Sequence, residues 1–271
     1  MPNFICVTCG TQYAATDVAP SHCSICEDER QYVGWGGQQW TTLEALQADH
    51  HNVIKRKEAG LTGIGTRPAF AIGQRALLIQ TPEGNLLWDC ISLIDDATVA
   101  AVRELGGVAA IAISHPHYYS SMVEWSRAFD APIYLHADDR EHVMRPDAAI
   151  EFWQDETQPL FGGLTLIRCG GHFAGGTIAH WPDGAEGRGV LLVGDILTVV
   201  SDRRYVSFMY SYPNLIPLSA AQVRRVVEAV EPYAFDRLYG AWWDRVVAHD
   251  GKAAVCRSAE RYIRAVSAQE A

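Results

Sequence analysis

The sequence has 271 residues, of which 48% are hydrophobic, and it carries a formal net charge of −10. This length allows one large domain plus a small module, and the hydrophobic content supports a sizeable core. Because the chain is acidic and has no basic run, it is poorly suited to bind nucleic acid or an anionic membrane surface. It contains no apolar run of about 18 residues, so we expect no transmembrane helix.

The first residues indicate a cytoplasmic protein. The segment Met1-Pro2-Asn3 lacks the basic start of a signal peptide, and Cys6 and Cys9 fall where the apolar part would be. In a chain without a secretory signal, paired cysteines favour metal binding over disulfides. We expect a cytoplasmic protein that acts on a small molecule, and a homo-oligomer is compatible with the sequence.

Residues 1–33 form a unit rich in cysteines and turn-forming residues. Cys6 and Cys9 make one Cys-x-x-Cys knuckle and Cys23 and Cys26 make another, with 13 residues between the two. Each knuckle directs two thiolates at one ion, so two knuckles predict a tetrahedral sulfur site. Such a short segment has little core of its own and is expected to fold around its metal. It resembles a zinc ribbon and also the rubredoxin-like module of rubrerythrins, so Zn²⁺ is expected and iron is the alternative.

Residues 34–66 are predicted to be a linker with a helix. The helix is expected from Thr41 to about Ala59, with Thr41 as its cap, Glu44 completing a capping box and Gly60 ending it. The Gly-rich stretch from Leu61 to Pro68 is expected to be a connector.

Residues 67–271 alternate strand and helix patterns and are predicted to form the large domain. The expected strands are Arg75–Thr81, Asn85–Asp89, 108–113, Pro132–Leu135, Leu164–Cys169, Thr177–Trp181 and Val190–Val193. The expected helices are Asp95–Leu105, Tyr118–Phe129, Leu218–Val230 and Ala253–Val266.

Metal-ligand residue types follow three of these strands. His115 and His117 follow the strand 108–113, His172 follows Leu164–Cys169 through two glycines, and Asp195 follows Val190–Val193 and Gly194. A lone histidine at a strand end is usually structural. Four such residues in this order indicate an open metal site instead.

These motifs resemble those of the metallo-β-lactamase superfamily over roughly residues 67–245. Trp88-Asp89-Cys90 resembles its early strand-end acid, and Ser114-His115-Pro116-His117 resembles the start of its histidine motif. The stretch 171–177 resembles its Gly-His turn, and Leu192-Val193-Gly194-Asp195 resembles its bridging-aspartate strand. The resemblance implies an α/β fold, an αββα sandwich with metals at the strand ends, preceded here by the small four-cysteine ribbon.

The sequence departs from that family where a second metal is held. Tyr119 and Ser120 stand where the histidine motif continues to an Asp and a His, and the late stretch Leu238–Trp243 lacks the family's histidine. His249 is a weak substitute for it. Tyrosine titrates near 10 and is a poor zinc ligand at neutral pH. We therefore predict one active-site metal, Zn²⁺ or Fe²⁺, held by His115, His117, His172 and Asp195.

The neighbouring side chains suggest further roles. Asp195 is expected to ligate the metal or to orient its water and take a proton. Tyr118 or Tyr119 is predicted to donate a hydrogen bond to a developing oxyanion, or else to fill the space of the lost metal. Asp89 is expected to bond to backbone near the histidine turn, and His136 to lie at the surface. The aromatic residues at 205–212 are expected either to pack in the core or to wall a pocket.

The first functional hypothesis is a metal-dependent hydrolase in which one metal activates water against an ester, thioester or lactone. The alternative is a non-haem iron oxidoreductase, dioxygenase-like, that receives electrons through the rubredoxin-like module. The third is a non-catalytic binding module with a degenerate site.

Overall fold

The computed structural model describes residues 1–267 of a chain that divides into two compact units, Met1–Trp153 and Gln154–Ala271. Each unit contains one mixed β-sheet and several helices, which confirms the predicted α/β class. No helix within residues 1–267 is long and apolar enough to cross a bilayer.

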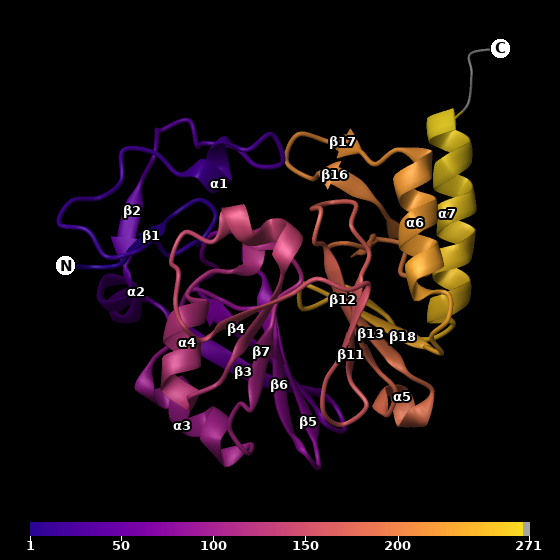
Figure 1. The fold of residues 1–271 in the computed structure, drawn as a ribbon, viewed down its shortest axis with the longest axis horizontal. Coiled ribbons are helices and arrows are strands. Elements are labelled where there is room, and N and C mark those ends of the chain that lie inside the picture. The colour runs from indigo at the N-terminus through magenta and orange to yellow at the C-terminus, as the bar shows by residue number, and fades with distance from the viewer. Residues whose placement is uncertain (268–271) are drawn as a thin grey trace. The chain divides into compact units, whose positions relative to one another are not determined.

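The first unit is built on a seven-stranded sheet with the order β3-β4-β5-β6-β7-β8-β9. Its strands are β3 His51–Glu58, β4 Leu61–Arg67, β5 Arg75–Thr81, β6 Gly84–Trp88, β7 Ala110–Ala112, β8 Ile133–His136 and β9 Ile150–Trp153. Strands β3 to β6 pair antiparallel and β6 to β9 pair parallel. Figure 1 shows the long antiparallel strands in purple. Every residue of β7 and nearly all of β6 is buried, so the core of this unit lies against the middle of the sheet.

The helices of this unit alternate with its strands along the chain. They are α1 Ser24–Glu27, α2 Leu43–Asp49, α3 Asp96–Glu104 and α4 Met122–Phe129, with short 3-10 turns η1 Pro116–Tyr118 and η2 Ala137–His142. Helix α3 begins as predicted, because the Asp95 side chain accepts a hydrogen bond from the backbone N–H of Thr98 at 2.7 Å. The N-terminal segment adds a two-stranded ribbon, β1 Phe4–Cys6 with β2 Trp40–Thr42.

The helix predicted from Thr41 to Ala59 is wrong over its second half. Helix α2 stops at Asp49, its cap is Thr42, and His51–Glu58 forms β3. The predicted connector is also wrong, because Leu61–Arg67 is strand β4 and pairs with β3. Gly60 has φ +75 and makes the turn between the two strands. The backbone partners that β4 offers outweigh the helix preference of the charged residues at 55–58.

The second unit holds a six-stranded sheet with the order β10-β11-β12-β13-β18-β19. Its strands are β10 Thr157–Pro159, β11 Thr165–Arg168, β12 Thr177–Trp181, β13 Val190–Gly194, β18 Arg237–Gly240 and β19 Val246–Val247. Two small ribbons join it, β14 Thr198–Val199 with β15 Val206–Ser207, and β16 Met209–Ser211 with β17 Ile216–Pro217. Its helices are α5 Gly184–Gly187, α6 Ala220–Val230 and α7 Gly251–Ser267.

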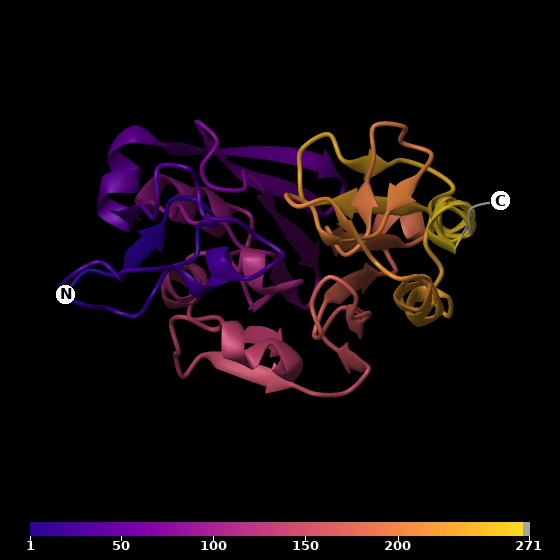
Figure 2. The same cartoon turned by 90° about the horizontal axis from the view of Figure 1, so that it is seen from above.

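Helices α6 and α7 lie side by side against this sheet, as both Figure 1 and Figure 2 show. They bury valines such as Val223 and Val226 from α6 and Val255 from α7 against Leu191 and Val193 of β13. This apolar layer fixes β13 and β18 as adjacent parallel strands. Their carboxyl ends, where Asp195 follows, are therefore rigidly supported.

Candidate metal centres

The four cysteines of the N-terminal segment converge on one point. Their Sγ atoms all lie within 4.8 Å of one another, with Cys6 3.5 Å from Cys26 and Cys9 3.7 Å from Cys23. The first knuckle is closed by a hydrogen bond from Gly10 N to the Cys6 carbonyl at 2.8 Å. All four cysteines are buried with free thiols, so the predicted four-cysteine cluster is confirmed.

The chemistry of this cluster fits a bound cation. Hydrogen bonding to Cys23 holds the pKa of the Cys6 thiol far below its usual range, whereas it raises the pKa of Cys9 and Cys26. Ionisation of one thiol therefore opposes ionisation of its neighbours, unless a bound cation balances the negative charge. Tyr13 donates a hydrogen bond to Cys23 Sγ at 3.3 Å, and Gln38 Nε2 donates one to Cys6 Sγ at 3.1 Å. Such donors support thiolate ligands of zinc or iron.

The first histidine pair lies in a buried turn after β7. His115 and His117 are 1% and 4% exposed, and their ring centroids are 5.1 Å apart. Pro116 begins η1 and fixes the turn between them. The Ser114 hydroxyl hydrogen-bonds to Nδ1 of His115 at 2.9 Å, so Nε2 is the nitrogen that would coordinate an ion.

Asp89 braces this turn from the end of β6, as predicted. Its carboxylate accepts a hydrogen bond from the Ser114 backbone N–H at 2.8 Å, and its own N–H donates to the Ala112 carbonyl at 2.9 Å. Asp89 has φ +60, a left-handed conformation that Asp tolerates better than most residues. Complete burial of the carboxyl raises its pKa to about 7, despite the hydrogen bonds from Ser114.

The residues after the histidines are buried and serve the turn itself. The Tyr118 ring lies edge-on to His115 at 4.4 Å, and burial raises the pKa of Tyr119 well above its usual range. The Ser120 hydroxyl accepts a hydrogen bond from Gln74 Nε2 at 3.1 Å and donates to the Cys90 carbonyl at 3.4 Å. Ser120 is therefore a structural residue, and the roles of the two tyrosines as donors to substrate stay predictions.

His172 is positioned within the second unit by the turn after β11. Gly170 and Gly171 take φ +68 and +84, and a Cβ on Gly171 would lie 3.0 Å from Leu218, so the sharp turn favours glycine. Nδ1 of His172 donates to the Tyr210 carbonyl at 2.7 Å. A carbonyl can only accept, so the proton sits on Nδ1 and Nε2 carries the lone pair for a metal.

Asp195 follows Gly194 at the end of β13 and is 4% exposed. The Tyr212 hydroxyl donates to its backbone carbonyl, and the Tyr212 ring lies edge-on to His172 at 5.6 Å between centroids. Burial, followed by the charge of Asp195, raises the pKa of Tyr212 well above its usual range. Tyr212 thus connects the two ligand candidates of this unit as a neutral hydrogen-bond donor.

The late strand end holds no ligand. Strand β18 runs parallel to β13, with Gly240 opposite Gly194, and Ala241 N donates to the Gly194 carbonyl at 2.9 Å. Ala241 therefore stands beside Asp195, in the late stretch that the sequence already shows to lack a histidine. His249 is exposed and faces Asp236 at 3.6 Å, beyond the opposite end of β18, so it is no substitute.

One predicted position is wrong, and several supporting residues were missed. His136 was expected at the surface, but it is 3% exposed because it ends β8 and packs edge-on to Trp153 at 4.5 Å. Ser114 is a polar side chain next to His115 in the sequence, whereas Gln38 lies 32 residues from Cys6 and gives no local signal. The sequence predicts Tyr212 only as one aromatic residue of the core or of a pocket wall, because its hydrogen bond to the Asp195 carbonyl spans 17 residues.

Comparisons with known proteins agree with this architecture. No protein-family model matches the chain. The uncharacterized protein YmaE of Bacillus subtilis (strain 168) is 52% identical over 271 residues, covering 99% of this chain and 98% of YmaE. Among solved structures, DIM-1 metallo-β-lactamase gives a TM-score of 0.58 at 14% identity, over 78% of this chain and 98% of DIM-1. The metallo-β-lactamase FIM-1 from Pseudomonas aeruginosa, in its mono-zinc form, gives 0.57 at 13% identity, over 78% of this chain and 95% of FIM-1.

Identities this low show the fold alone, whereas the match to YmaE extends over both sequences almost completely. The chain therefore has the metallo-β-lactamase fold and belongs to the same family as YmaE of Bacillus subtilis.

Proposed function

We propose that the protein is a metal-dependent hydrolase in which His115, His117 and His172 hold one metal ion, with Asp195 as fourth ligand or as the group that orients water. The orientation of the histidines carries the proposal. His115 and His172 are each held through Nδ1, by Ser114 and by the Tyr210 carbonyl, so each presents Nε2. Histidines that bind catalytic metals are held in this way. The three histidines are residues that could hold a metal ion.

A single metal is favoured by the residues around the two strand ends. Ser120 is engaged by Gln74 and Cys90, and Ala241 occupies the late position beside Asp195. Neither offers a ligand for a second ion. The FIM-1 structure is a mono-zinc form, so this fold accommodates one zinc ion.

A divalent metal held by His115, His117 and His172 would lower the pKa of a nearby water and would polarise a scissile carbonyl. Asp195 would hold the attacking water and accept its proton. The buried tyrosines would remain protonated, because burial raises the pKa of Tyr119 and of Tyr212. An ester, thioester or lactone of a small molecule fits this chemistry.

The test is a panel of ester, thioester and lactone substrates assayed with the wild-type protein, His115→Ala and His249→Ala. His249 is exposed and remote from the histidine turn along the chain, so it is the matched control. We expect turnover by the wild type and His249→Ala, and only background with His115→Ala. Equal activity of His115→Ala and the wild type would refute the proposal.

A redox function is the second candidate, and the four-cysteine cluster favours it. Four thiolates with hydrogen-bond donors at Cys6 and Cys23 also suit an iron ion that cycles between oxidation states. Metal analysis and a visible spectrum of protein produced with iron available separate the two candidates. A colourless protein that contains only zinc would exclude the redox candidate.

A further inference from the structure

The first cysteine knuckle is joined directly to the histidine turn of the same unit. Gly10 follows Cys9, and its carbonyl accepts a hydrogen bond from the Ser92 hydroxyl at 2.8 Å. Two residues later, Gln12 N donates to the Ser120 carbonyl at 3.1 Å. The approach is close, because a Cβ on Gly10 would lie 2.6 Å from Ser92 Oγ. The backbone just after Cys9 is thus hydrogen-bonded to the backbone just after His117, through Gln12 and Ser120.

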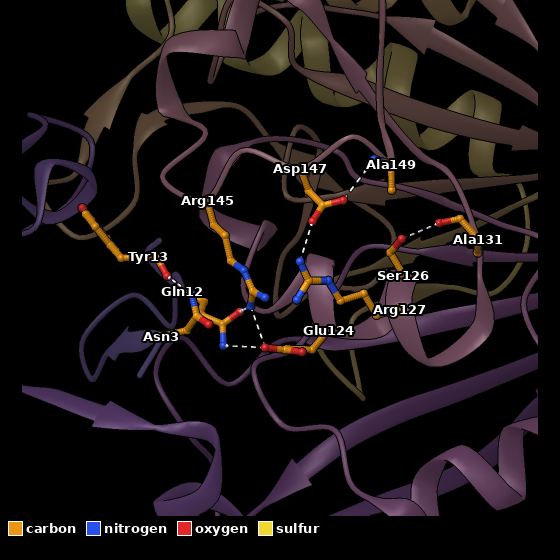
Figure 3. A network of polar contacts seen from close by, with 10 residues as sticks. All are labelled: Asn3, Gln12, Tyr13, Glu124, Ser126, Arg127, Ala131, Arg145, Asp147 and Ala149. Atoms are coloured by element: carbon orange, nitrogen blue, oxygen red, sulfur yellow. Dashed lines mark hydrogen bonds and ion pairs between the residues drawn. The ribbon is translucent and has the colours of Figure 1, made fainter. Parts of the chain in front are cut away.

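The Gln12 side chain adds a second connection, which Figure 3 shows from close by. Its Oε1 accepts from Arg145, and its Nε2 donates to Glu124 at 3.4 Å. Arg145 also pairs with Glu124 at 2.6 Å. Glu124 lies in the first turn of α4, which starts right after the histidine turn. Gln12 and Arg145 are buried, so losing one partner would strand polar groups inside the protein.

Ser120 is the residue where these constraints meet. It has φ +45, an unfavourable conformation for a serine, so its surroundings must hold it there. Its hydroxyl is fixed by Gln74 and its carbonyl by Gln12 N. Only Tyr118 and Tyr119, both buried, separate it from His117. A shift of Ser120 would therefore move His117.

The four-cysteine segment, residues 1–33, supplies Gly10 and Gln12 and carries the four clustered thiols. The buried residues of its core cluster are the four cysteines and Ile25, and the partly buried Tyr13, Trp40, Ile72 and Met144 pack against them. A segment with so small a core folds when its thiolates bind an ion. We infer that the four-cysteine segment positions the His115–His117 turn through Gln12 and Ser120, so that metal loading of the cysteines sets the affinity of the histidines for their own ion. The second half of this inference rests on the proposed function.

The main experiment measures hydrogen exchange in full-length wild type and Cys26→Ser, without metal added for the histidines. Cys26 contacts Cys6 Sγ and lies far along the chain from Ser120. Metal analysis confirms that the wild-type cysteines are loaded and those of the variant are not. We expect amide exchange over residues 115–121 to accelerate about tenfold in the variant, together with residues 4–13. Faster exchange over 4–13 with unchanged exchange over 115–121 would overturn the inference.

A second variant keeps the inference testable if Cys26→Ser does not fold. Gln12→Ala leaves every cysteine in place and is expected to accelerate exchange over 115–121 about fivefold. Arg127→Ala is the matched control, because Arg127 also lies on α4 but its guanidinium pairs with Asp147 at 2.9 Å. Equal exchange of these two variants over 115–121 would also overturn the inference.

Cobalt titration then tests the effect on the histidines. With zinc held by the cysteines, Co²⁺ added to the wild type should bind the histidines without a thiolate charge-transfer band, and about tenfold more weakly in Cys26→Ser. Wild-type affinity in folded Cys26→Ser would refute the coupling. If the wild type binds no Co²⁺ at the histidines, the proposed function fails, and hydrogen exchange alone still decides whether the four-cysteine segment holds the turn.

Discussion

Asp89→Asn should change how the stability of the protein depends on pH. Asp89 is a fully buried carboxyl whose charged form is opposed by desolvation, and its pKa is raised from 3.8 to about 7. Asparagine has nearly the same shape, keeps the oxygen that accepts from Ser114 N, and tolerates the left-handed conformation at φ +60. The substitution therefore removes the ionisation and little else.

The size of the effect follows from the pKa. At 1.36 kcal/mol per pH unit, a pKa raised from 3.8 to about 7 corresponds to about 4 kcal/mol of lost stability once the group is ionised. This figure is an upper bound, because the protein relaxes around a buried charge. We expect a measured effect of about 2 kcal/mol.

The sign is fixed by proton binding. Between pH 3.8 and about 7 the folded state holds the proton on Asp89 while the unfolded state has released it. Folding stability from this group therefore falls as the pH rises through that window, and the loss is complete above it. Asp89→Asn has no such group, so its stability relative to the wild type should increase from pH 5 to pH 8.

Urea denaturation at pH 5 and pH 8 measures the difference directly, because each variant serves as its own reference across the two conditions. The free energy of unfolding of Asp89→Asn minus that of the wild type should become more positive at pH 8. Parallel pH profiles for the two proteins would show that Asp89 titrates as an ordinary carboxyl, and the reasoning from its burial would be refuted.

Three further predictions concern single residues. Gly10→Ala places a Cβ against Ser92 Oγ at a residue whose φ is +82. We expect the free energy of unfolding, measured by chemical denaturation, to fall by about 2 kcal/mol and zinc to be lost more easily to a chelator. Unchanged values would mean that the close approach is absent. Tyr212→Phe keeps the ring beside His172 but removes the hydrogen bond to the Asp195 carbonyl. We expect the free energy of unfolding to fall by about 1 kcal/mol and the affinity for metal to decrease. A metal titration curve identical to that of the wild type would contradict this role. Ser219→Ala removes the capping box of α6 and should lower the free energy of unfolding by about 1 kcal/mol. The metal content of the protein should stay the same. A loss of metal would mean that α6 does more than support the sheet.

Much of the local structure could be predicted because it depends on neighbours in the chain. The β5–β6 hairpin and the start of α3 at its Asp95 cap follow from patterns a few residues long. The helix expected over residues 41–59 failed because strand β3 depends on pairing with β4, which no local pattern encodes. His136 failed for the same kind of reason, since its burial depends on Trp153.

Residue types and their spacing are enough to identify the side chains that carry the chemistry: two Cys-x-x-Cys pairs, and histidines and an aspartate placed after apolar strands. Ligand identity is a property of single residues and their spacing, so it can be read along the chain. The way these ligands are supported could not be read along the chain, because Tyr212 reaches the Asp195 carbonyl and Gln12 bonds to Ser120 only in the folded protein. Hydrogen bonds of this kind often join residues far apart in the chain, and folding must bring them together before they can act.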